Sequence, residues 1–210
     1  MMLTPSHHDV LVIVDMQNDF CKGGALPTAD GHEIVPVINA VAGKFTNVIL
    51  TQDWHPRGHA SFASAHSGKN PLDTVDMPYG TQTLWPDHVV QGTWGAEFHP
   101  DLDVPHAQLV IRKGYNKDVD SYSAFCMVDG ITRTGLAGYL RERGIERVFV
   151  CGCAIDYCVG GLALDARKAG FETFIISDAS ASIFPDGSAL KAWADTQAAG
   201  CRKISSADIV

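Results

Sequence analysis

The strongest constraint on the fold is a series of apolar runs, rich in β-branched residues, that alternates with helical patterns. The runs are almost continuously hydrophobic, which is typical of strands buried on both faces of a parallel sheet. Such strands, alternating with helices, form a parallel sheet with helices on both faces. We therefore expect an α/β fold of three layers, α/β/α, with a mostly parallel central sheet. The predicted strands are 10–14, 48–51, 109–111, 148–151 and 173–176, and the predicted helices are 31–43, 132–143, 157–169 and 187–199.

Length and composition fit a single domain over residues 1–210. A chain of this length buries roughly 70% of its unfolded surface. The formal net charge of -8 argues against nucleic acid and against an anionic membrane as partners. No apolar run reaches the roughly 18 residues of a membrane span, and the run at 10–14 lacks the basic leader of a signal peptide. The 6 cysteines show no regular spacing, so we expect free thiols and a cytoplasmic protein.

Polar side chains follow several of the predicted strands at the point where each strand ends. Asp15 follows the first strand, and Asp53 and His55 follow the second. Lys113 follows the third strand, and Cys158 follows the fourth. Ligands of open parallel sheets bind in the crevice beyond the carboxyl ends of the strands. We therefore expect these side chains to meet at one edge of the sheet and to form the functional site.

Cys158 is the candidate nucleophile. It lies in the first turn of the helix predicted at 157–169, with Asp156 as the expected N-cap. The positive end of a helix dipole favours an anion there, and it can lower a thiol pKa from about 8.5 to roughly 3.5–7.5. Asp15 would accept the thiol proton, and Lys113 would stabilise the thiolate and orient Asp15. Taken singly, the three could also be an inert thiol, a turn residue and a solvated lysine.

Asp53 and His55 form an Asp-x-His pattern that predicts a metal site. Alternate residues of an extended chain point to the same side, so both side chains can bind one ion. One carboxylate and two imidazoles with open positions make a site for Zn²⁺, Fe²⁺ or Mn²⁺. The spacing does not choose the third ligand, for which the candidates are His59, His66, His88 and His99.

Aromatic side chains near these polar groups are candidates for holding a flat ring. Phe20 lies shortly after Asp15, and Tyr122 shortly after Lys113, so both could reach the crevice. For most of the other aromatic residues, core packing is the expected role. The set under consideration is Phe20, Trp85, Trp94, Tyr122 and Phe125.

Cys151 and Cys153 lie close to Cys158 and raise an alternative of another class. A redox or metal-sensing protein could use the three thiols together and would have no hydrolase activity. The single residue between Cys151 and Cys153 is fewer than zinc-binding loops use. We therefore expect both to be small buried side chains at a strand end.

The chain resembles the nicotinamidases, a family of cysteine hydrolases in the group that also contains the isochorismatases. The resemblance runs through nearly the whole chain and implies an isochorismatase-like fold of Rossmann-like topology. Asp-x-His combined with Trp-Pro-x-His separates nicotinamidases from metal-free relatives; the family commonly has cysteine after the second motif, where this chain has Val89. The matching segments are 14–20, 51–55, 85–88, 113–114 with 120–125, and 152–158.

The resemblance also implies roles for individual residues. Asp15, Lys113 and Cys158 would form the catalytic triad. Asp53, His55 and His88 would bind one divalent metal ion, with zinc preferred over iron or manganese and with His59 and Ser61 as open additional ligands. A cis peptide would join Ala154 to Ile155 and would aim the N–H groups of Ala154 or Ile155 and of Cys158 at an oxyanion. Phe20, Trp85 and Tyr122 would bind the substrate.

The implied activity is hydrolysis of nicotinamide to nicotinate and ammonia through a cysteine thioester, as part of NAD salvage. The expected partner is therefore a small molecule, without nucleic acid or membrane, while homo-oligomer formation is left open. The alternative within the same group is an amidase for a carbamoyl or maleamate-type substrate. The metal-ligand pattern argues against that alternative, because those relatives generally lack the metal site.

Overall fold

The structure, a computed structural model, describes residues 2–210. The strands of its main sheet are β1 (Asp9–Val14), β2 (Asn47–Asp53), β5 (Leu109–Lys113), β6 (Arg147–Gly152), β7 (Glu172–Ser180) and β8 (Arg202–Ile204). The helices are α1 (Val35–Ala42), α2 (Leu136–Glu142), α3 (Gly160–Lys168) and α4 (Ser188–Ala198). The sheet is 6-stranded and parallel, in the order β5-β2-β1-β6-β7-β8.

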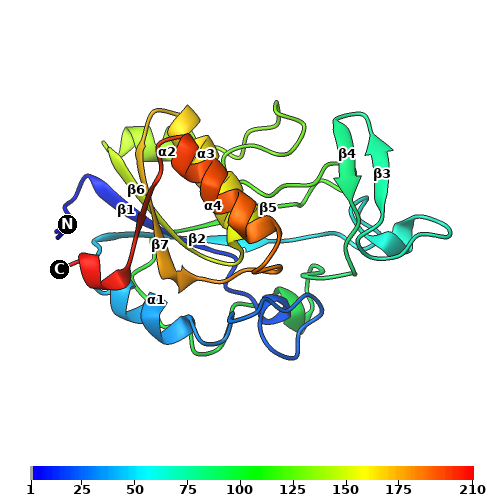
Figure 1. The fold of residues 1–210 in the computed structure, drawn as a ribbon, viewed down its shortest axis with the longest axis horizontal. Coiled ribbons are helices and arrows are strands. Elements are labelled where there is room, and N and C mark those ends of the chain that lie inside the picture. The colour runs from blue at the N-terminus through cyan, green and yellow to red at the C-terminus, as the bar shows by residue number, and fades with distance from the viewer. Residues whose placement is uncertain (1) are drawn as a thin grey trace.

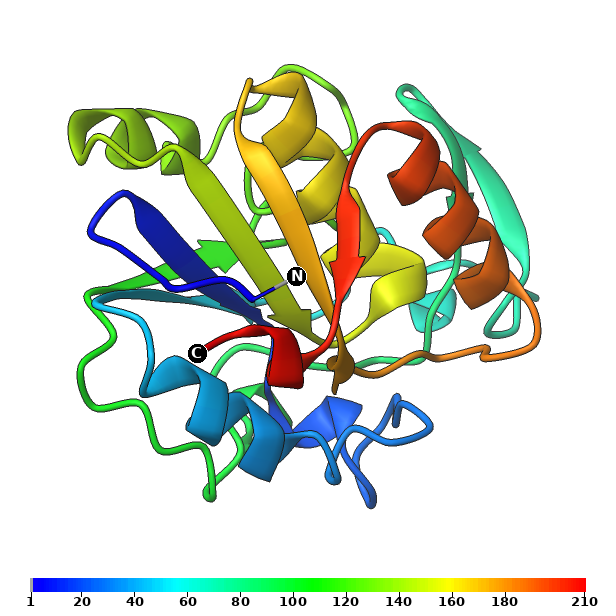
Figure 2. The ribbon, with the colours of Figure 1, turned by 60° about the vertical axis from the view of Figure 1, so that its left-hand side comes forward.

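Helices cover both faces of this sheet, so the predicted three-layer α/β fold is confirmed. Helix α1 lies on one face, while α2, α3 and α4 lie on the other (Figures 1 and 2). Side chains of a strand alternate between its two faces. Accordingly, Leu11 and Ile13 of β1 join the core beneath α1, whereas Val10 and Val12 join the core beneath α2 and α3.

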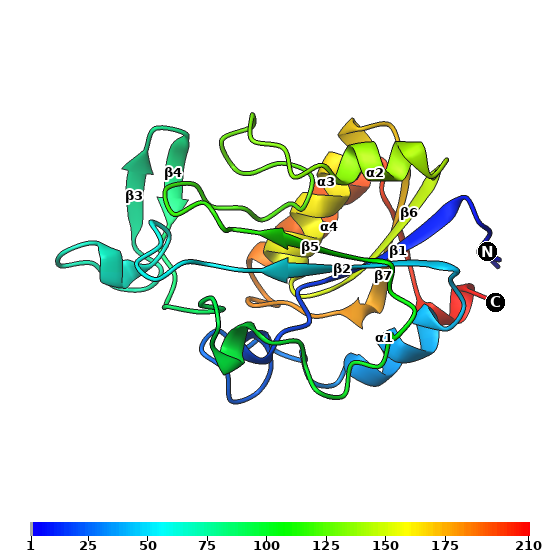
Figure 3. The ribbon, with the colours of Figure 1, turned by 180° about the vertical axis from the view of Figure 1, so that it is seen from behind.

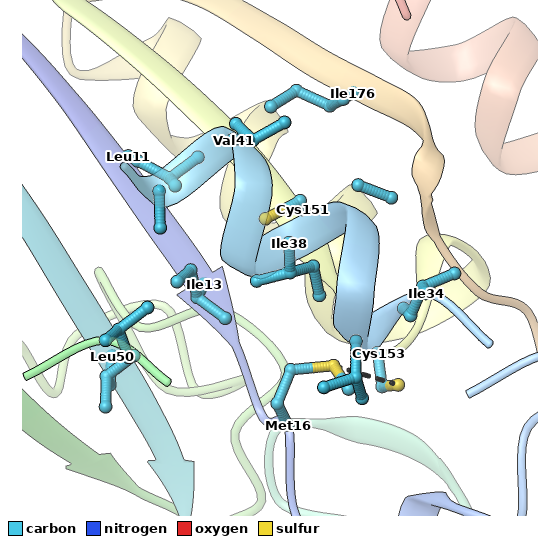
Figure 4. Close-up of a cluster of buried hydrophobic side chains, with 14 of the residues drawn as sticks. Leu11, Ile13, Met16, Ile34, Ile38, Val41, Leu50, Cys151, Cys153 and Ile176 are labelled. Atoms are coloured by element: carbon cyan, nitrogen blue, oxygen red, sulfur yellow. Dashed lines mark hydrogen bonds between the residues drawn. The ribbon is translucent and has the colours of Figure 1, made fainter. Parts of the chain in front are cut away.

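The core beneath α1 contains Cys151 and Cys153, the two cysteines that lie close in sequence to the candidate nucleophile Cys158. Figure 4 shows Cys151 and Cys153 beside Ile38 of α1, and Cys153 Sγ donates a hydrogen bond to Met16 Sδ at 3.7 Å. Burial raises the pKa of both thiols, which keeps them protonated and unreactive. All 6 cysteines are free and buried. The expectation that Cys151 and Cys153 serve packing is confirmed, and the sensor alternative loses its basis.

Two elements were not predicted from the sequence. Strand β8 has little apolar character and pairs with β7 at the edge of the sheet. A separate antiparallel hairpin joins β3 (Thr74–Met77) to β4 (Gly80–Thr83), and its side chains are largely exposed. Both depend on backbone pairing rather than on a buried apolar face, so hydrophobic patterns do not reveal them.

The strand directions decide where a site can form. The two chain termini lie at one end of the molecule, and the β3–β4 hairpin lies at the opposite end (Figures 1 and 3). Strands β2 and β5 point toward the hairpin, so the carboxyl edge of the sheet faces that end (Figure 3). Among the described residues, no helix has both the length and the apolar character needed to cross a membrane.

Candidate active site and metal centre

The carboxyl ends of the central strands bring the predicted polar side chains together. Asp53 and Lys113 are paired neighbours at the ends of β2 and β5. Asp15 follows β1 in a left-handed backbone conformation, with φ of 48°. Cys158 lies in the π-helical turn Ile155–Val159 that follows β6 and leads into α3. All four side chains are buried, as a shared interior site requires.

Lys113 is the centre of a buried cluster of charges. Its Nζ lies 2.7 Å from Asp15 Oδ2 and 3.2 Å from Asp53 Oδ1. The same ammonium group donates to Cys158 Sγ at 3.4 Å and to the Ser121 carbonyl at 3.1 Å. A buried ammonium is costly unless it is paired and hydrogen-bonded. The two carboxylates and the carbonyl offset that cost and hold Lys113 beside the thiol.

The pKa of the Cys158 thiol differs from the value expected for a thiol at the start of a helix. Burial raises the pKa of the Cys158 thiol, and Lys113 opposes this rise without cancelling it. The expectation of a lowered thiol pKa is therefore wrong for this environment. The Cys158 hydrogen bond with Asp15 also favours the protonated thiol. Burial raises the pKa of Asp15 against the opposing effect of Lys113, which makes Asp15 a better proton acceptor.

The turn that carries Cys158 differs from the predicted helix start. Asp156 is not the N-cap, because the turn begins one residue earlier, at Ile155. The Asp156 carboxylate instead accepts hydrogen bonds from the backbone N–H groups of Ile183 at 3.1 Å and Phe184 at 2.8 Å. Asp156 therefore connects the turn that carries Cys158 to the loop that precedes α4.

The backbone around Ala154 corrects two further expectations. The cis peptide joins Cys153 to Ala154, one residue before the bond expected between Ala154 and Ile155. The Ile155 N–H donates to the Ala181 carbonyl at 2.8 Å, so it is not free to bind an oxyanion. Within residues 2–210 the Ala154 N–H has no hydrogen-bond acceptor. The candidate oxyanion donors are thus reduced to the N–H groups of Ala154 and Cys158.

Asp53, His55 and His88 present ligand atoms that all lie within 4.8 Å of one another. Nε2 of His55 and Nε2 of His88 are 3.2 Å and 4.0 Å from Asp53 Oδ2. Two ligands bound tetrahedrally to one ion at about 2.1 Å are about 3.4 Å apart. Asp53 Oδ1 is paired with the Lys113 ammonium, so Oδ2 is the carboxylate oxygen that faces both Nε2 atoms. The spacing and this donor set of one carboxylate oxygen and two imidazole nitrogens fit a divalent cation.

Hydrogen bonds at Nδ1 orient both histidine rings toward Asp53. Nδ1 of His55 donates to the Gly114 carbonyl at 2.9 Å, and Nδ1 of His88 donates to the Pro86 carbonyl at 2.8 Å. These bonds turn both Nε2 atoms toward Asp53. Burial lowers the pKa of His55, but the Asp53 carboxylate outweighs burial and raises that pKa, so His55 releases a proton when it binds an ion. Burial, reinforced by His55, lowers the pKa of His88 to about 4, so its imidazole stays neutral at ordinary pH.

The residue after Lys113 must be glycine. Gly114 has φ of +66°, and a Cβ there would lie 2.5 Å from Asp53 Oδ1 and 2.5 Å from His55 Cε1. Any larger residue would therefore push two of the candidate metal ligands aside.

The structure separates two of the candidate histidines from this group. His66 Nε2 donates to the Ala60 carbonyl at 2.8 Å, and His99 Nε2 is bonded to His32 Nδ1 at 3.1 Å. Neither His66 nor His99 belongs to a group of convergent ligand atoms in the described residues. Both are accordingly excluded as third ligands.

His59 lies closer, because His55, His59 and Asp120 form a second group of convergent atoms. However, His59 Nε2 donates to the Asn116 carbonyl at 2.9 Å, and His59 Nδ1 is bonded to Ser61 Oγ at 2.7 Å. Since a carbonyl can only accept, Nδ1 is the acceptor nitrogen of this ring. Both His59 nitrogens are engaged, so His59 offers no free lone pair toward the ion, whereas Ser61 Oγ keeps its lone pairs and stays an open additional ligand.

One pocket is lined by both the candidate nucleophile Cys158 and the candidate metal ligands. Its aromatic side is continuous: the Trp85 and Tyr157 rings pack edge to face at 4.7 Å, and Tyr122 lies 5.4 Å from Tyr157. Phe20, Trp85 and Tyr122, the residues expected to bind substrate, all line it. The full lining is Phe20, Leu26, Asp53, His55, Trp85, His88, Asp120, Tyr122, Tyr157, Cys158 and Ile183.

Sequence reasoning missed four of these lining residues. Tyr157 precedes Cys158, and Asp120 stands in a segment that carries the family resemblance, so proximity could have found both. Leu26 and Ile183 come from loops without any local signal. Of the remaining aromatic residues, Trp94 is 58% exposed and Phe125 packs against Phe171 at 6.1 Å, so neither lines the pocket.

The arrangement of a buried thiol, a carboxylate and an ammonium beyond a parallel sheet is typical of hydrolases with a cysteine nucleophile. The family model described as "Isochorismatase domain" matches residues 9–208, and the chain belongs to this family. It is 52% identical over 200 residues to the nicotinamidase of Acinetobacter baylyi, an alignment that covers 95% of this chain and 94% of the relative.

Solved structures agree with this assignment. A nicotinamidase/pyrazinamidase of Acinetobacter baumanii superposes with a TM-score of 0.95 and 53% identity, covering 97% of this chain and 98% of the other. The pyrazinamidase of Pyrococcus horikoshii in complex with zinc superposes with a TM-score of 0.78 and 36% identity, covering 94% of this chain and 99% of the other. The family and the curated relatives identify the chain as a hydrolase that acts on an amide.

Proposed function

We propose that this protein is a metal-dependent nicotinamidase, which hydrolyses nicotinamide to nicotinate and ammonia in NAD salvage. Residues 1–210 form its single hydrolase domain, and its free buried thiols suit a reducing cytoplasm. The observation that carries the proposal is the pocket in which Cys158 and the Asp53, His55 and His88 ligand group face the same space. This arrangement supports a reaction in which the thiol and a metal ion would act on one small aromatic substrate.

The first half of the reaction forms the thioester. Asp15 accepts the thiol proton of Cys158, and the sulfur attacks the carboxamide carbon of nicotinamide. Lys113, 3.4 Å from the sulfur, stabilises the negative charge as it develops. The N–H groups of Ala154 and Cys158 would bind the oxyanion of the tetrahedral intermediate, with roughly 3–4 kcal/mol per donor in comparable sites. Asp15 then returns its proton to the nitrogen as the C–N bond breaks, and ammonia leaves.

The second half releases nicotinate. Asp15 accepts a proton from water while the oxygen attacks the thioester carbon. The C–S bond breaks, the thiolate takes back the proton, and the carboxylic acid of nicotinate forms. The raised pKa of Asp15 suits it for both directions of transfer.

Asp53, His55 and His88 would hold the divalent ion, for which zinc is preferred and iron or manganese are the alternatives. When bound, the ion supplies an electrophilic centre that can anchor the pyridine nitrogen of the substrate and polarise a water molecule. Phe20, Trp85 and Tyr122 would pack against the ring and fix its plane.

Ammonia release from nicotinamide by zinc-reconstituted protein tests the proposal. We expect Cys158→Ala to lower kcat by at least about 10³-fold, while Cys201→Ala, which removes another buried thiol remote from the pocket, leaves it unchanged. A panel of amides with carbamoyl and maleamate-type substrates is measured in parallel. Turnover of one of those in place of nicotinamide, or activity that survives in Cys158→Ala, contradicts the proposal.

A further inference from the structure

Gln17 and Asp19, in the segment between Asp15 and Phe20, are buried polar residues for which the reaction has no role. Gln17 is 0% exposed and Asp19 is 9% exposed. Their side chains do not line the pocket. Buried polar side chains are rarely kept without hydrogen-bond partners, so their partners indicate what they do.

All hydrogen bonds of the Gln17 side-chain amide go to backbone atoms at or near the candidate metal ligand Asp53. Its Oε1 accepts from the Asp53 N–H at 2.8 Å, and its Nε2 donates to the Asp53 carbonyl at 2.8 Å. The second proton of Nε2 goes to the Ala96 carbonyl at 2.9 Å. Gln17 therefore holds both backbone polar groups of Asp53 and fixes the direction of its side chain.

Asp19 makes the matching contact with the loop of the third ligand. Its Oδ2 accepts from the Val89 N–H at 2.7 Å, and its Oδ1 accepts from the Ala25 N–H at 3.0 Å. A Cβ at Gly95 would lie 2.1 Å from Asp19 Oδ2, so only glycine lets the chain pack against this carboxylate. The carboxylate is thus enclosed and cannot easily change its partners.

Val89 connects Asp19 to two of the candidate metal ligands. It directly follows His88, and its φ of 43° is in the left-handed region, which is unfavourable for a β-branched residue. Its N–H is held by Asp19, and its carbonyl accepts from the His55 N–H at 3.2 Å. Asp19 therefore fixes the one residue that touches the backbone of His55 and is covalently joined to His88.

We propose that Gln17 and Asp19 are positioning residues of the metal centre, which hold the backbones of Asp53, His55 and His88 in place for a divalent ion. This inference rests on the proposed function, since it assumes that these three side chains bind metal. It assigns one short segment two tasks: Asp15 serves the nucleophile, and the two residues that follow at alternate positions serve the metal.

The test compares Zn²⁺ affinities measured by competition with a chromogenic chelator. Asp19→Asn keeps the size of the side chain but replaces one of its two acceptor oxygens with a donor, so either Val89 or Ala25 loses its partner. We expect the dissociation constant for Zn²⁺ to rise about 10–100-fold, the range typical for loss of a group that supports a metal ligand. We also expect kcat of Asp19→Asn to be restored at high Zn²⁺ concentration.

Asp178→Asn is the matched control. Its carboxylate also accepts from a backbone N–H and a hydroxyl, both of Ser206, and Asp178 does not line the pocket. It should bind Zn²⁺ as the wild type does. Gln17→Met provides an independent second variant, since methionine has a similar length and cannot hold Asp53; if one variant is unfolded, judged by circular dichroism of the metal-free protein, the other decides.

Wild-type Zn²⁺ affinity in a folded variant overturns the inference alone, provided that the wild type binds Zn²⁺ and hydrolyses nicotinamide. Activity lost in Asp19→Asn and not restored by Zn²⁺ also overturns it, because the residue would then act elsewhere. Failure of the wild type itself to bind Zn²⁺ removes both this inference and the proposed metal site.

Discussion

Lys113 Nζ lies 2.7 Å from Asp15 Oδ2, and both side chains are fully buried. The ion pair belongs to two different strands, since Lys113 ends β5 and Asp15 follows β1 across the intervening β2. Catalysis of the proposed kind depends on this pair, because the carboxylate must remain ionised in an environment that favours its neutral form.

Replacing Lys113 with methionine should remove activity without removing the nucleophile. The length of the side chain is kept, but the charge that opposes the raised pKa of Cys158 is lost. We expect kcat to fall by at least about 10³-fold and alkylation of Cys158 by iodoacetamide to slow at pH 7.5. Lys168→Met, on the exposed side of α3, serves as the control. A loss of kcat smaller than tenfold in Lys113→Met would show that the ammonium is not required.

Removal of one metal ligand should be distinguishable from removal of a nearby histidine. His88→Gln should weaken Zn²⁺ binding by more than the roughly 10–100-fold expected for a supporting residue, because a direct ligand is lost. His66→Gln is the matched control, since the His66 side chain donates to the Ala60 carbonyl and does not line the pocket. Equilibrium dialysis with metal analysis measures both variants. Equal Zn²⁺ affinity in the two variants would contradict the assignment of His88 as a ligand.

Asp156→Asn should weaken the attachment of the loop that contains Ile183, one of the residues that line the pocket. The carboxylate holds the N–H groups of Ile183 and Phe184 and the hydroxyl of Ser188, and the amide can accept on one side only. We expect KM for nicotinamide to rise several-fold with a smaller change in kcat, because Ile183 lines the pocket but does not touch the reacting atoms. Asp195→Asn, on α4, is the control. An unchanged KM would mean that the loop holds its place without Asp156.

Asp9 should make the free energy of unfolding depend on pH in the acidic range. Burial alone would raise the pKa of Asp9, but hydrogen bonds from Arg147 and Ser6 outweigh it and lower the pKa below 3.8. The carboxylate therefore stabilises the fold above its unfolded pKa, and this contribution is lost as the pH falls through the lower folded pKa. Arg147 is 26% exposed, so we expect only about 1–3 kcal/mol for Asp9→Asn at pH 7.

Urea denaturation at several pH values measures this effect. The difference in free energy of unfolding between wild type and Asp9→Asn should shrink as the pH approaches the lowest value at which both remain folded. A difference that stays constant from pH 7 down to pH 4 and below would show that the charge of Asp9 is not its source.

Much of the fold could be predicted because the central strands carry their own signal. Runs such as Val10–Val14 and Val148–Cys151 are buried on both faces and are therefore continuously apolar. Strand β8 escaped prediction because Arg202 and Lys203 give it no such run, and its place is set by pairing with β7. Local patterns report burial, whereas edge pairing is decided by the rest of the sheet.

Part of the candidate site could likewise be predicted from the sequence, and part could not. Convergence of Asp15, Asp53, Lys113 and Cys158 followed from the rule that parallel strands end at one edge. The spacing of the histidines could not select His88, because the loop that delivers it has no periodicity. The predicted N-cap role of Asp156 was wrong for a related reason. A capping pattern considers only residues within one helical turn, whereas Asp156 is hydrogen-bonded to a loop 27 residues later in the chain.

Strand β5 is an outer strand of the sheet, yet its last residue is the counter-ion of two buried carboxylates. Outer strands normally open and exchange their amide protons more readily than inner ones. Opening β5 would withdraw Lys113 and leave Asp15 and Asp53 as two neighbouring negative charges in a region of low dielectric constant. The two ion pairs of Lys113 therefore stabilise the outer strand β5 against local opening. The amide protons near Lys113 should exchange with deuterium as slowly as those of an interior strand.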